Sequence, residues 1–320
     1  MQARVAAPPG VVVSPRDGVA AIEWPTAALA VAIYGGWLAL TWCHAALPPW
    51  LAFPGLIWLV AWQSSLQHEV LHGHPTRVRA INDALGFPPL SLWLPYGVYR
   101  PSHLRHHDDA RLTDPLDDPE SRYWLDEQWG VLSRPGRLLV AGQNTFLGRL
   151  LLGPAWTVGR FFYFQGRALA HFHPGAWRIW GPHLLGVAAV ILWLGQVCRF
   201  NPLLYIVAVV YPATALVLIR SFAEHRAARG VRERIAIVEH APVLGLLFLY
   251  NNLHLVHHAW PELPWYRIPA IYRLYRDRLV AANGGLLYDG YLDVARRFLV
   301  TPHDRLLHPL GRVPSETIAP

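Results

Sequence analysis

Apolar residues in this chain concentrate in four long runs: two tight turns join them in pairs, one long polar segment separates the pairs, and another follows the last run. The runs cover residues 26–47, 50–66, 179–198 and 203–219. Each approaches the roughly 20 apolar residues that a helix needs to cross a bilayer core. Pro48-Pro49 joins the first two runs and Asn201-Pro202 joins the last two. The pattern predicts an all-α integral membrane protein with four transmembrane helices in two hairpins.

Three other apolar stretches are poor candidates for spanning helices. Residues 80–99 are interrupted by prolines, and residues 241–250 are too short to cross. Residues 137–164 mix leucines and aromatics with arginines, which is typical of a helix lying in the membrane interface. We therefore expect residues 25–270 to form one membrane domain. Residues 1–24 are predicted to be a mobile or surface-lying tail, and residues 271–320 a cytoplasmic C-terminal segment.

The arginines predict the orientation of the chain in the membrane. Every basic side chain is arginine, and nearly all lie in residues 67–178 or after residue 219. Basic loops favour the cytoplasmic side, so both termini and both long segments are predicted to be cytoplasmic in a multi-pass protein. The first apolar run is not preceded by a signal-peptide pattern.

Composition supports a lipid-facing exterior. Hydrophobic residues make up 53% of the chain and charged residues 15%, against about 25% charged in a soluble domain. The net charge is +7, but the arginines lie beside apolar runs, which favours lipid headgroups or an acidic redox partner over nucleic acid. Two cysteines, Cys43 and Cys198, support neither a disulfide framework nor a cysteine metal site.

Histidines cluster beside the apolar runs. Ten of the 17 histidines fall into four short clusters. They are His68, His72 and His74; His103, His106 and His107; His225; and His254, His257 and His258.

The spacing of these histidines predicts metal binding. The pattern H-x-x-H-H occurs at 103–107 and again at 254–258. Positions i, i+3 and i+4 share one face of a helix, so each copy projects three imidazoles in one direction, and His68 and His72 do the same. Imidazole is a ligand for Fe, Zn, Cu and Ni. Two triplets, this pair and His225 give nine ligands, which suit two metals; His74 stays open between ligand and bystander.

Acidic residues accompany the histidines. A metal-bound imidazole usually donates its second N–H to a carboxylate or a carbonyl. We expect Glu69, Asp108 and Glu224 to accept these bonds, whereas Asp117 and Asp118 are equally compatible with solvated loop positions.

Taken together, these motifs resemble the histidine boxes of the membrane fatty acid desaturase family. The resemblance covers residues 26–269 and includes Leu94-Pro95-Tyr96 before the second box and Trp265-Tyr266-Arg267 after the third. It implies four spanning helices under a cytoplasmic helical cap, with the nine histidines named above holding two iron ions. Some acyl-CoA desaturases carry an asparagine, acting through a water, where this chain has Ser221. Asn251 or Asn252 is a candidate substitute.

The resemblance also implies the reaction. O₂ and two electrons would oxidise an unactivated C–H bond of a membrane lipid or acyl chain, with desaturation as the leading expectation. Enzymes with the same boxes also act as hydroxylases or ketolases on other lipids, alkanes or carotenoids, so that alternative stays open. A separate ferredoxin-like or cytochrome-like electron donor is implied, because no such domain is fused here.

Other classes of protein remain as alternatives. His68-Glu69-Val70-Leu71-His72 is also an H-E-x-x-H sequence, in which two histidines bind zinc and the glutamate is the general base of a metalloprotease. That function leaves the other histidine clusters unexplained. A membrane haem protein would place its histidines within the spans rather than beyond them. A non-catalytic metal-binding membrane protein is the third alternative.

Overall fold

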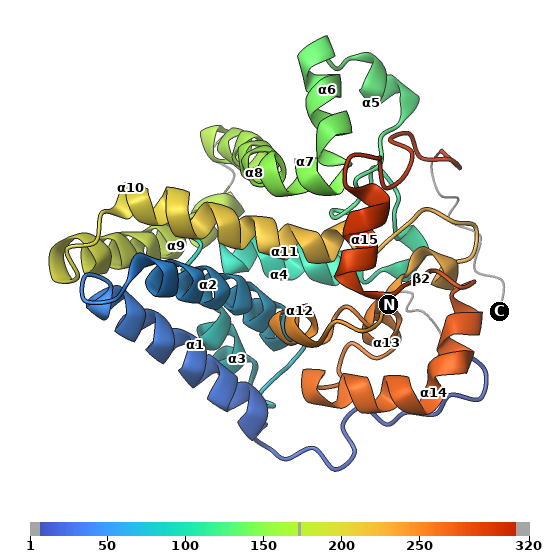
Figure 1. Ribbon diagram of the computed structural model, residues 1–320, viewed down its shortest axis with the longest axis horizontal. Coiled ribbons are helices and arrows are strands. Elements are labelled where there is room, and N and C mark those ends of the chain that lie inside the picture. The colour runs from blue at the N-terminus through green and yellow to red at the C-terminus, as the bar shows by residue number, and fades with distance from the viewer. Residues whose placement is uncertain (1–6, 172–173, 312–320) are drawn as a thin grey trace. The chain divides into compact units, whose positions relative to one another are not determined.

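The computed structural model describes residues 7–171 and 174–311 and is mostly helical (Figure 1). The helical class predicted from the sequence is confirmed. The chain divides into two compact units. We call residues 19–100 and 153–218 the span unit, and residues 1–18, 101–152 and 219–320 the box unit. Residues 1–6 of the predicted tail and residues 312–320 of the predicted C-terminal segment lie outside the described residues.

The span unit contains the long apolar helices. They are α1 (Trp24–Cys43), α2 (Pro49–Leu71), α3 (Arg79–Gly86), α8 (Gly153–Ala170), α9 (Pro174–Leu192), the π-helical turn η2 (Trp193–Val197), α10 (Pro202–Tyr205), the π-helical turn η3 (Ile206–Val210) and most of α11 (Tyr211–Ala223). Proline begins α2 and α10, where its fixed φ suits the first helical turn. Asn201 caps α10 by accepting from the Leu203 amide at 2.8 Å.

Among the described residues, three helical stretches are long and apolar enough to cross a membrane: Trp24–Cys43, Gly175–Val197 and Pro202–Ala223. These correspond to three of the four predicted spans. The predicted span at 50–66 lies in α2, which has 23 residues and is long enough. Its last turns carry Gln63, Gln67 and Glu69, however, which make it more polar than the other three. The fourth crossing therefore stays a prediction.

Hydrogen bonds between side chains tie the apolar helices of the span unit together. Trp37 donates to the Tyr205 hydroxyl at 2.9 Å, and that hydroxyl donates to the Leu90 carbonyl at 2.8 Å. Trp193 donates to the Thr41 hydroxyl at 3.0 Å. Polar groups surrounded by apolar side chains need such partners, so these bonds fix how α1, η2 and α10 pack.

The box unit is built from short helices around one small sheet. Its elements are the end of α4 (Tyr96–His106), η1 (Asp109–Arg111), α5 (Asp126–Gly130), α6 (Arg134–Gln143), α7 (Phe146–Leu151), the end of α11, η4 (Arg232–Arg234), β1 (Ile237–Val238), α12 (Pro242–Leu247), α13 (His254–Ala259), η5 (Trp265–Arg267), α14 (Ile268–Ala282), β2 (Leu287–Tyr288) and α15 (Gly290–Phe298). Strands β1 and β2 are parallel, with Ile237 opposite Leu287.

The apolar stretch at 137–164 is divided among α6, α7 and α8 rather than forming one interfacial helix. Thr145 caps α7 by accepting from the Gly148 amide at 3.1 Å. A Cβ at Gly148 would lie 2.0 Å from the Gly142 carbonyl oxygen, so only glycine permits this close turn. Thr145 and Gly148 therefore determine where the chain breaks between α6 and α7.

The described part of the N-terminal segment lies along α14. Val11 is only 5% exposed and belongs to the apolar core of the box unit. Arg267 donates to the carbonyls of Pro15 and Asp17 at 3.0 and 2.9 Å. These contacts make residues 7–18 part of the box unit.

Helix α13 orients its histidines through its apolar side. Leu255 and Val256 are fully buried in the same core as Ile235 and Ile237. Because His254, His257 and His258 occupy the i, i+3 and i+4 positions, burial of the leucine and the valine directs the three imidazoles to the opposite face.

Asn283 provides a test of this packing. It is buried at the end of α14 and donates to the carbonyls of Ile235 and Leu286 at 3.0 and 2.9 Å. Asn283→Ala removes two buried hydrogen bonds, although the Leu286 carbonyl keeps the Ile237 amide as a donor, and we expect a loss of about 1–3 kcal/mol in stability. Thermal unfolding in detergent measures the effect. The control Leu274→Ala removes an exposed side chain of the same helix; equal melting temperatures for the two variants would contradict the assigned role.

Candidate metal centre

Three segments of the box unit bring seven histidines together. His103 and His106 lie in the last turns of α4, with His107 directly after it. Helix α13 carries His254, His257 and His258, and His225 follows α11. Both H-x-x-H-H boxes therefore take the helical form that their spacing predicts, with His107 one residue beyond its helix. All seven side chains are buried or half-buried.

Four of these histidines form a first group: His106, His225, His254 and His258. Their Nε2 atoms face one another. The Nε2 of His225 lies 3.1 Å from that of His106 and 2.9 Å from that of His254. The Nε2 of His254 lies 3.1 Å from that of His258.

The opposite nitrogens of these rings all face hydrogen-bond acceptors. The Nδ1 atoms of His106 and His258 lie 2.8 and 2.6 Å from carboxylate oxygens of Asp118 and Asp109. The Nδ1 of His225 lies 3.3 Å from the Arg234 carbonyl, and that of His254 lies 3.1 Å from a neighbouring carbonyl.

These partners fix the protonation of the rings. A neutral imidazole carries one N–H, and an acceptor at Nδ1 draws the proton to that side. When all four rings are neutral, each Nε2 presents a lone pair, so that four lone pairs point at one another about 3 Å apart. Two nitrogens that each bind one ion at about 2.1 Å and at right angles also lie about 3 Å apart. The donor set therefore fits a metal cation.

A second group consists of His103, His107 and His257. The Nε2 of His107 lies 3.1 Å from that of His103 and 3.0 Å from that of His257. Glu120 faces the Nδ1 of His103 at 2.7 Å. The rings of His107 and His258 stack with centroids 4.4 Å apart, so the two groups are adjacent.

Charge around the two groups also favours cations. Asp109, Asp118 and Glu224 are buried, and Glu120 has a side chain 28% exposed. Arg220 pairs with Glu224 at 2.9 Å and offsets one of these four carboxylates. Buried charges are costly unless they are paired, so the remaining negative charge indicates a site built to hold positive charge.

The pKa values follow from the same environment. Burial lowers the pKa of His103 to about 4, although Glu120 acts in the opposite direction. Burial, together with repulsion from neighbouring histidines, lowers the pKa values of His225 and His254 well below normal. Burial acts the same way on His106, but Asp118 and Glu120 outweigh it and raise its pKa to about 10. Those two carboxylates stabilise any cation there, whether a proton or a metal.

The structure also places the three predicted carboxylates. Glu224 lies 3.3 Å from the Nδ1 of His254, as expected of an orienting carboxylate. Asp108 lines a polar pocket with Arg105, Arg111 and Asp117, and its neighbour Asp109 makes the contact with His258.

Glu69 lies in the span unit, 3.9 Å from the Nε2 of His74. The Nδ1 of His74 faces Glu23 at 2.7 Å. In the same unit, the rings of His68 and His72 lie 5.0 Å apart at the end of α2, and both are buried. The two histidines thus share a helix face as predicted, while His74 contacts carboxylates.

Three carboxylates that contact histidines were not among the predicted acceptors, and of these only Asp118 had been left open. Asp109, Asp118 and Glu120 face His258, His106 and His103 respectively. The cluster of acidic residues after the second box was the available signal. Separations of 12 and 17 residues within a loop have no periodicity that could select among them.

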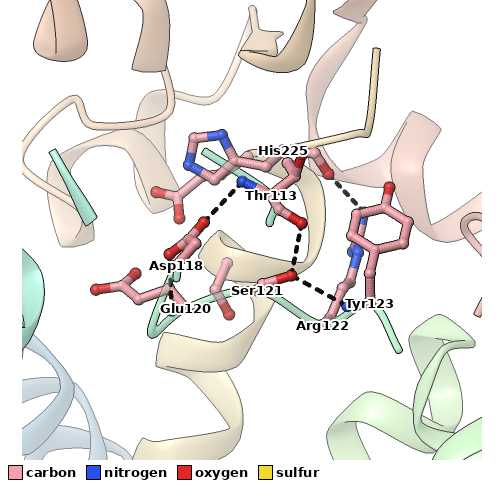
Figure 2. A pocket seen from close by; sticks show the side chains of 9 residues that line it. Thr113, Asp118, Glu120, Ser121, Arg122, Tyr123 and His225 are labelled. Carbon is pink, nitrogen blue, oxygen red and sulfur yellow. Dashed lines mark hydrogen bonds between the residues drawn. The ribbon is translucent and has the colours of Figure 1, made fainter. Parts of the chain in front are cut away.

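Asn251 and Asn252 are buried in the turn before α13. Asn251 donates to the Phe248 carbonyl at 3.0 Å, and Asn252 donates to the Val238 carbonyl at 2.7 Å. These bonds hold the turn that leads into the third box. Ser221 lines a small pocket of about 30 Å³ with Glu224 and His225. Figure 2 shows this pocket, whose volume suffices for one or two waters.

Comparison with known proteins gives one clear result. No curated protein matches the chain. Residues 41–290 match the fatty acid desaturase family, a span that includes all ten clustered histidines. The match covers well over half of the chain and confirms the resemblance seen in the histidine boxes. The chain belongs to the fatty acid desaturase family.

Proposed function

We propose that this protein is a membrane di-iron oxidoreductase that uses O₂ to desaturate a lipid acyl chain. The observation that carries the proposal is the convergence of imidazole rings whose Nε2 atoms face one another and whose Nδ1 atoms face carboxylates and carbonyls. Such a donor set suits iron, and the family match favours desaturation among the reactions that iron performs.

The proposed ligand set has nine members. His106, His225, His254 and His258 would hold one iron, and His103, His107 and His257 would belong to the other. The sequence pattern and the family match add His68 and His72 to the set. His74 is not a member of the proposed set, because carboxylates face both of its ring nitrogens.

The reaction is balanced by simple bookkeeping of hydrogens and electrons. Desaturation removes two hydrogens from adjacent carbons and reduces O₂ to two waters, with two electrons and two protons from outside. Iron, when bound, supplies the oxidising chemistry. The protein's part is to hold each ligand proton on Nδ1 and to keep the imidazoles buried, away from bulk water.

The membrane arrangement is part of the proposal. The four apolar runs provide four crossings. The arginine distribution favours a cytoplasmic location for both termini and for the histidines. Electrons would come from a separate ferredoxin-like or cytochrome-like donor. The net charge of +7 favours an acidic partner, and its docking should weaken as salt is raised.

Lipid mass spectrometry on cells producing the protein tests the reaction. We expect a lipid species lacking two hydrogens, absent from cells producing the double variant His257→Ala, His258→Ala, because that variant removes one ligand from each group. A species that gains one oxygen instead would identify a hydroxylase or ketolase. No difference between the two cultures would contradict an oxidising role toward lipids.

Adjacent aspartates offer a sharper test of the ligand geometry. Asp109→Asn removes the charge that holds the proton on the Nδ1 of His258, and we expect about 10- to 100-fold weaker binding of one metal. Asp108→Asn is the matched control, because Asp108 lines the pocket with Arg105 and Arg111. Titration of the purified protein with Fe²⁺ measures both. Equal losses in the two variants would show that loop charge, rather than the contact with His258, governs binding.

A further inference from the structure

The guanidinium of Arg122 holds the backbone on which His225 sits. Its Nη1 donates to the Phe222 carbonyl at 2.7 Å, and its Nη2 donates to the His225 carbonyl at 2.6 Å. Figure 2 shows Arg122 reaching toward His225 at the edge of the small pocket. One side chain thus hydrogen-bonds to both ends of the turn that leads from α11 to this histidine.

His303 in turn holds Arg122. The Nη2 of Arg122 also lies 2.6 Å from the Nδ1 of His303. Arginine has only donors, so this Nδ1 must be the acceptor, and the imidazole proton lies on Nε2. That Nε2 lies 3.0 Å from the Tyr288 hydroxyl. His303 is only 6% exposed, and burial together with the nearby arginines lowers its pKa, which keeps it a neutral acceptor.

Among the four histidines of the first group, His225 is the one that most needs such support. Its Nδ1 contact, 3.3 Å to the Arg234 carbonyl, is the longest of the four. It is also half-buried, whereas the other three are buried. The other three lie within helices α4 and α13, but His225 follows the end of α11. Its position therefore depends on its backbone being fixed.

The segment that carries His303 lies beyond the family match, which ends at residue 290. It is anchored by backbone hydrogen bonds. The His303 amide donates to the Asn144 carbonyl at 2.8 Å, and the Trp124 amide donates to the Leu306 carbonyl at 2.9 Å. Asn144 also donates to the Asp304 carbonyl at 2.7 Å. The segment is thus a fixed part of the box unit that can hold Arg122 in place.

We propose that Arg122 and His303 are positioning residues that set the ligand His225, so that a segment outside the family match tunes one of the two metal sites. This inference rests on the proposed function, because it takes His225 to be a metal ligand. Its consequence is selective: loss of the contact should weaken the metal of the first group and leave the second group unchanged.

The test uses the full chain, purified in detergent and titrated with Co²⁺ as a visible-absorbing probe. The wild type should bind two equivalents, and His225→Ala should lose the absorption of one. Arg122→Gln should bind that same equivalent at least about tenfold more weakly. Arg137→Gln is the matched control, since Arg137 likewise donates to two carbonyls, those of Leu132 and Gly130. It should bind both equivalents as the wild type does.

Two variants of His303 separate positioning from packing. Asn places an oxygen near the position of Nδ1, so His303→Asn should keep the Arg122 contact and the wild-type cobalt spectrum. Gln reaches the position of Nε2 instead, so His303→Gln should reproduce Arg122→Gln. Circular dichroism and monodisperse elution confirm that each variant is folded.

Several outcomes would overturn the inference. Wild-type cobalt binding in both Arg122→Gln and His303→Gln would remove the positioning role while leaving the metal centre intact. Equal damage in His303→Asn and His303→Gln would assign His303 to packing. If His225→Ala itself kept two equivalents, the proposed ligand set would fail, and the role of Arg122 with it.

Discussion

The structure of the box unit depends on lone pairs that face one another. Buried imidazoles whose protons are drawn to Nδ1 repel at their Nε2 atoms unless a cation lies among them. The Nδ1 atoms of two of these histidines face aspartate carboxylates, and the Nδ1 atoms of the other two face backbone carbonyls. The local fold of the chain therefore sets the orientation of the imidazoles. Metal binding and stability of this unit should accordingly be coupled.

This constraint explains why so much of the box unit is irregular. Short helices and turns aim side chains from several directions at one point. The cost is that each turn needs its own fastening. Asn283 fastens the end of α14, Asn252 the turn before α13, and Arg122 the turn before His225. Each does so by donating to backbone carbonyls that would otherwise be buried without a partner.

The sequence predicted the parts of the molecule in which apolar residues or histidines recur at a regular spacing. Three of the apolar runs correspond to helices able to cross a membrane, and both H-x-x-H-H boxes are helical around their histidines. Glu224, which the sequence offered because it immediately precedes His225, lies 3.3 Å from the Nδ1 of His254, and its orienting role stays a prediction. The division of residues 137–164 depends on Gly148, whose close turn a hydrophobic pattern does not reveal. Asp109, Asp118 and Glu120 were beyond reach because loop closure, not spacing, selects them.

The box unit is assembled from residues 1–18, 101–152 and 219–320, and this discontinuity bears on its biosynthesis. His103 leaves the ribosome 200 residues before His303, which at ordinary synthesis rates is a delay of roughly 10–40 s. For the first 151 of those 200 residues the second box has no partner from α13, and throughout the interval it lacks the C-terminal segment that carries His303. A nascent chain in this condition offers imidazoles to whichever metal is at hand, and copper or zinc binds them more tightly than ferrous iron. Under the proposed function, loading of iron is therefore a matter of timing as much as of affinity, and it favours cells that keep competing metals scarce while the last third of the chain is being made.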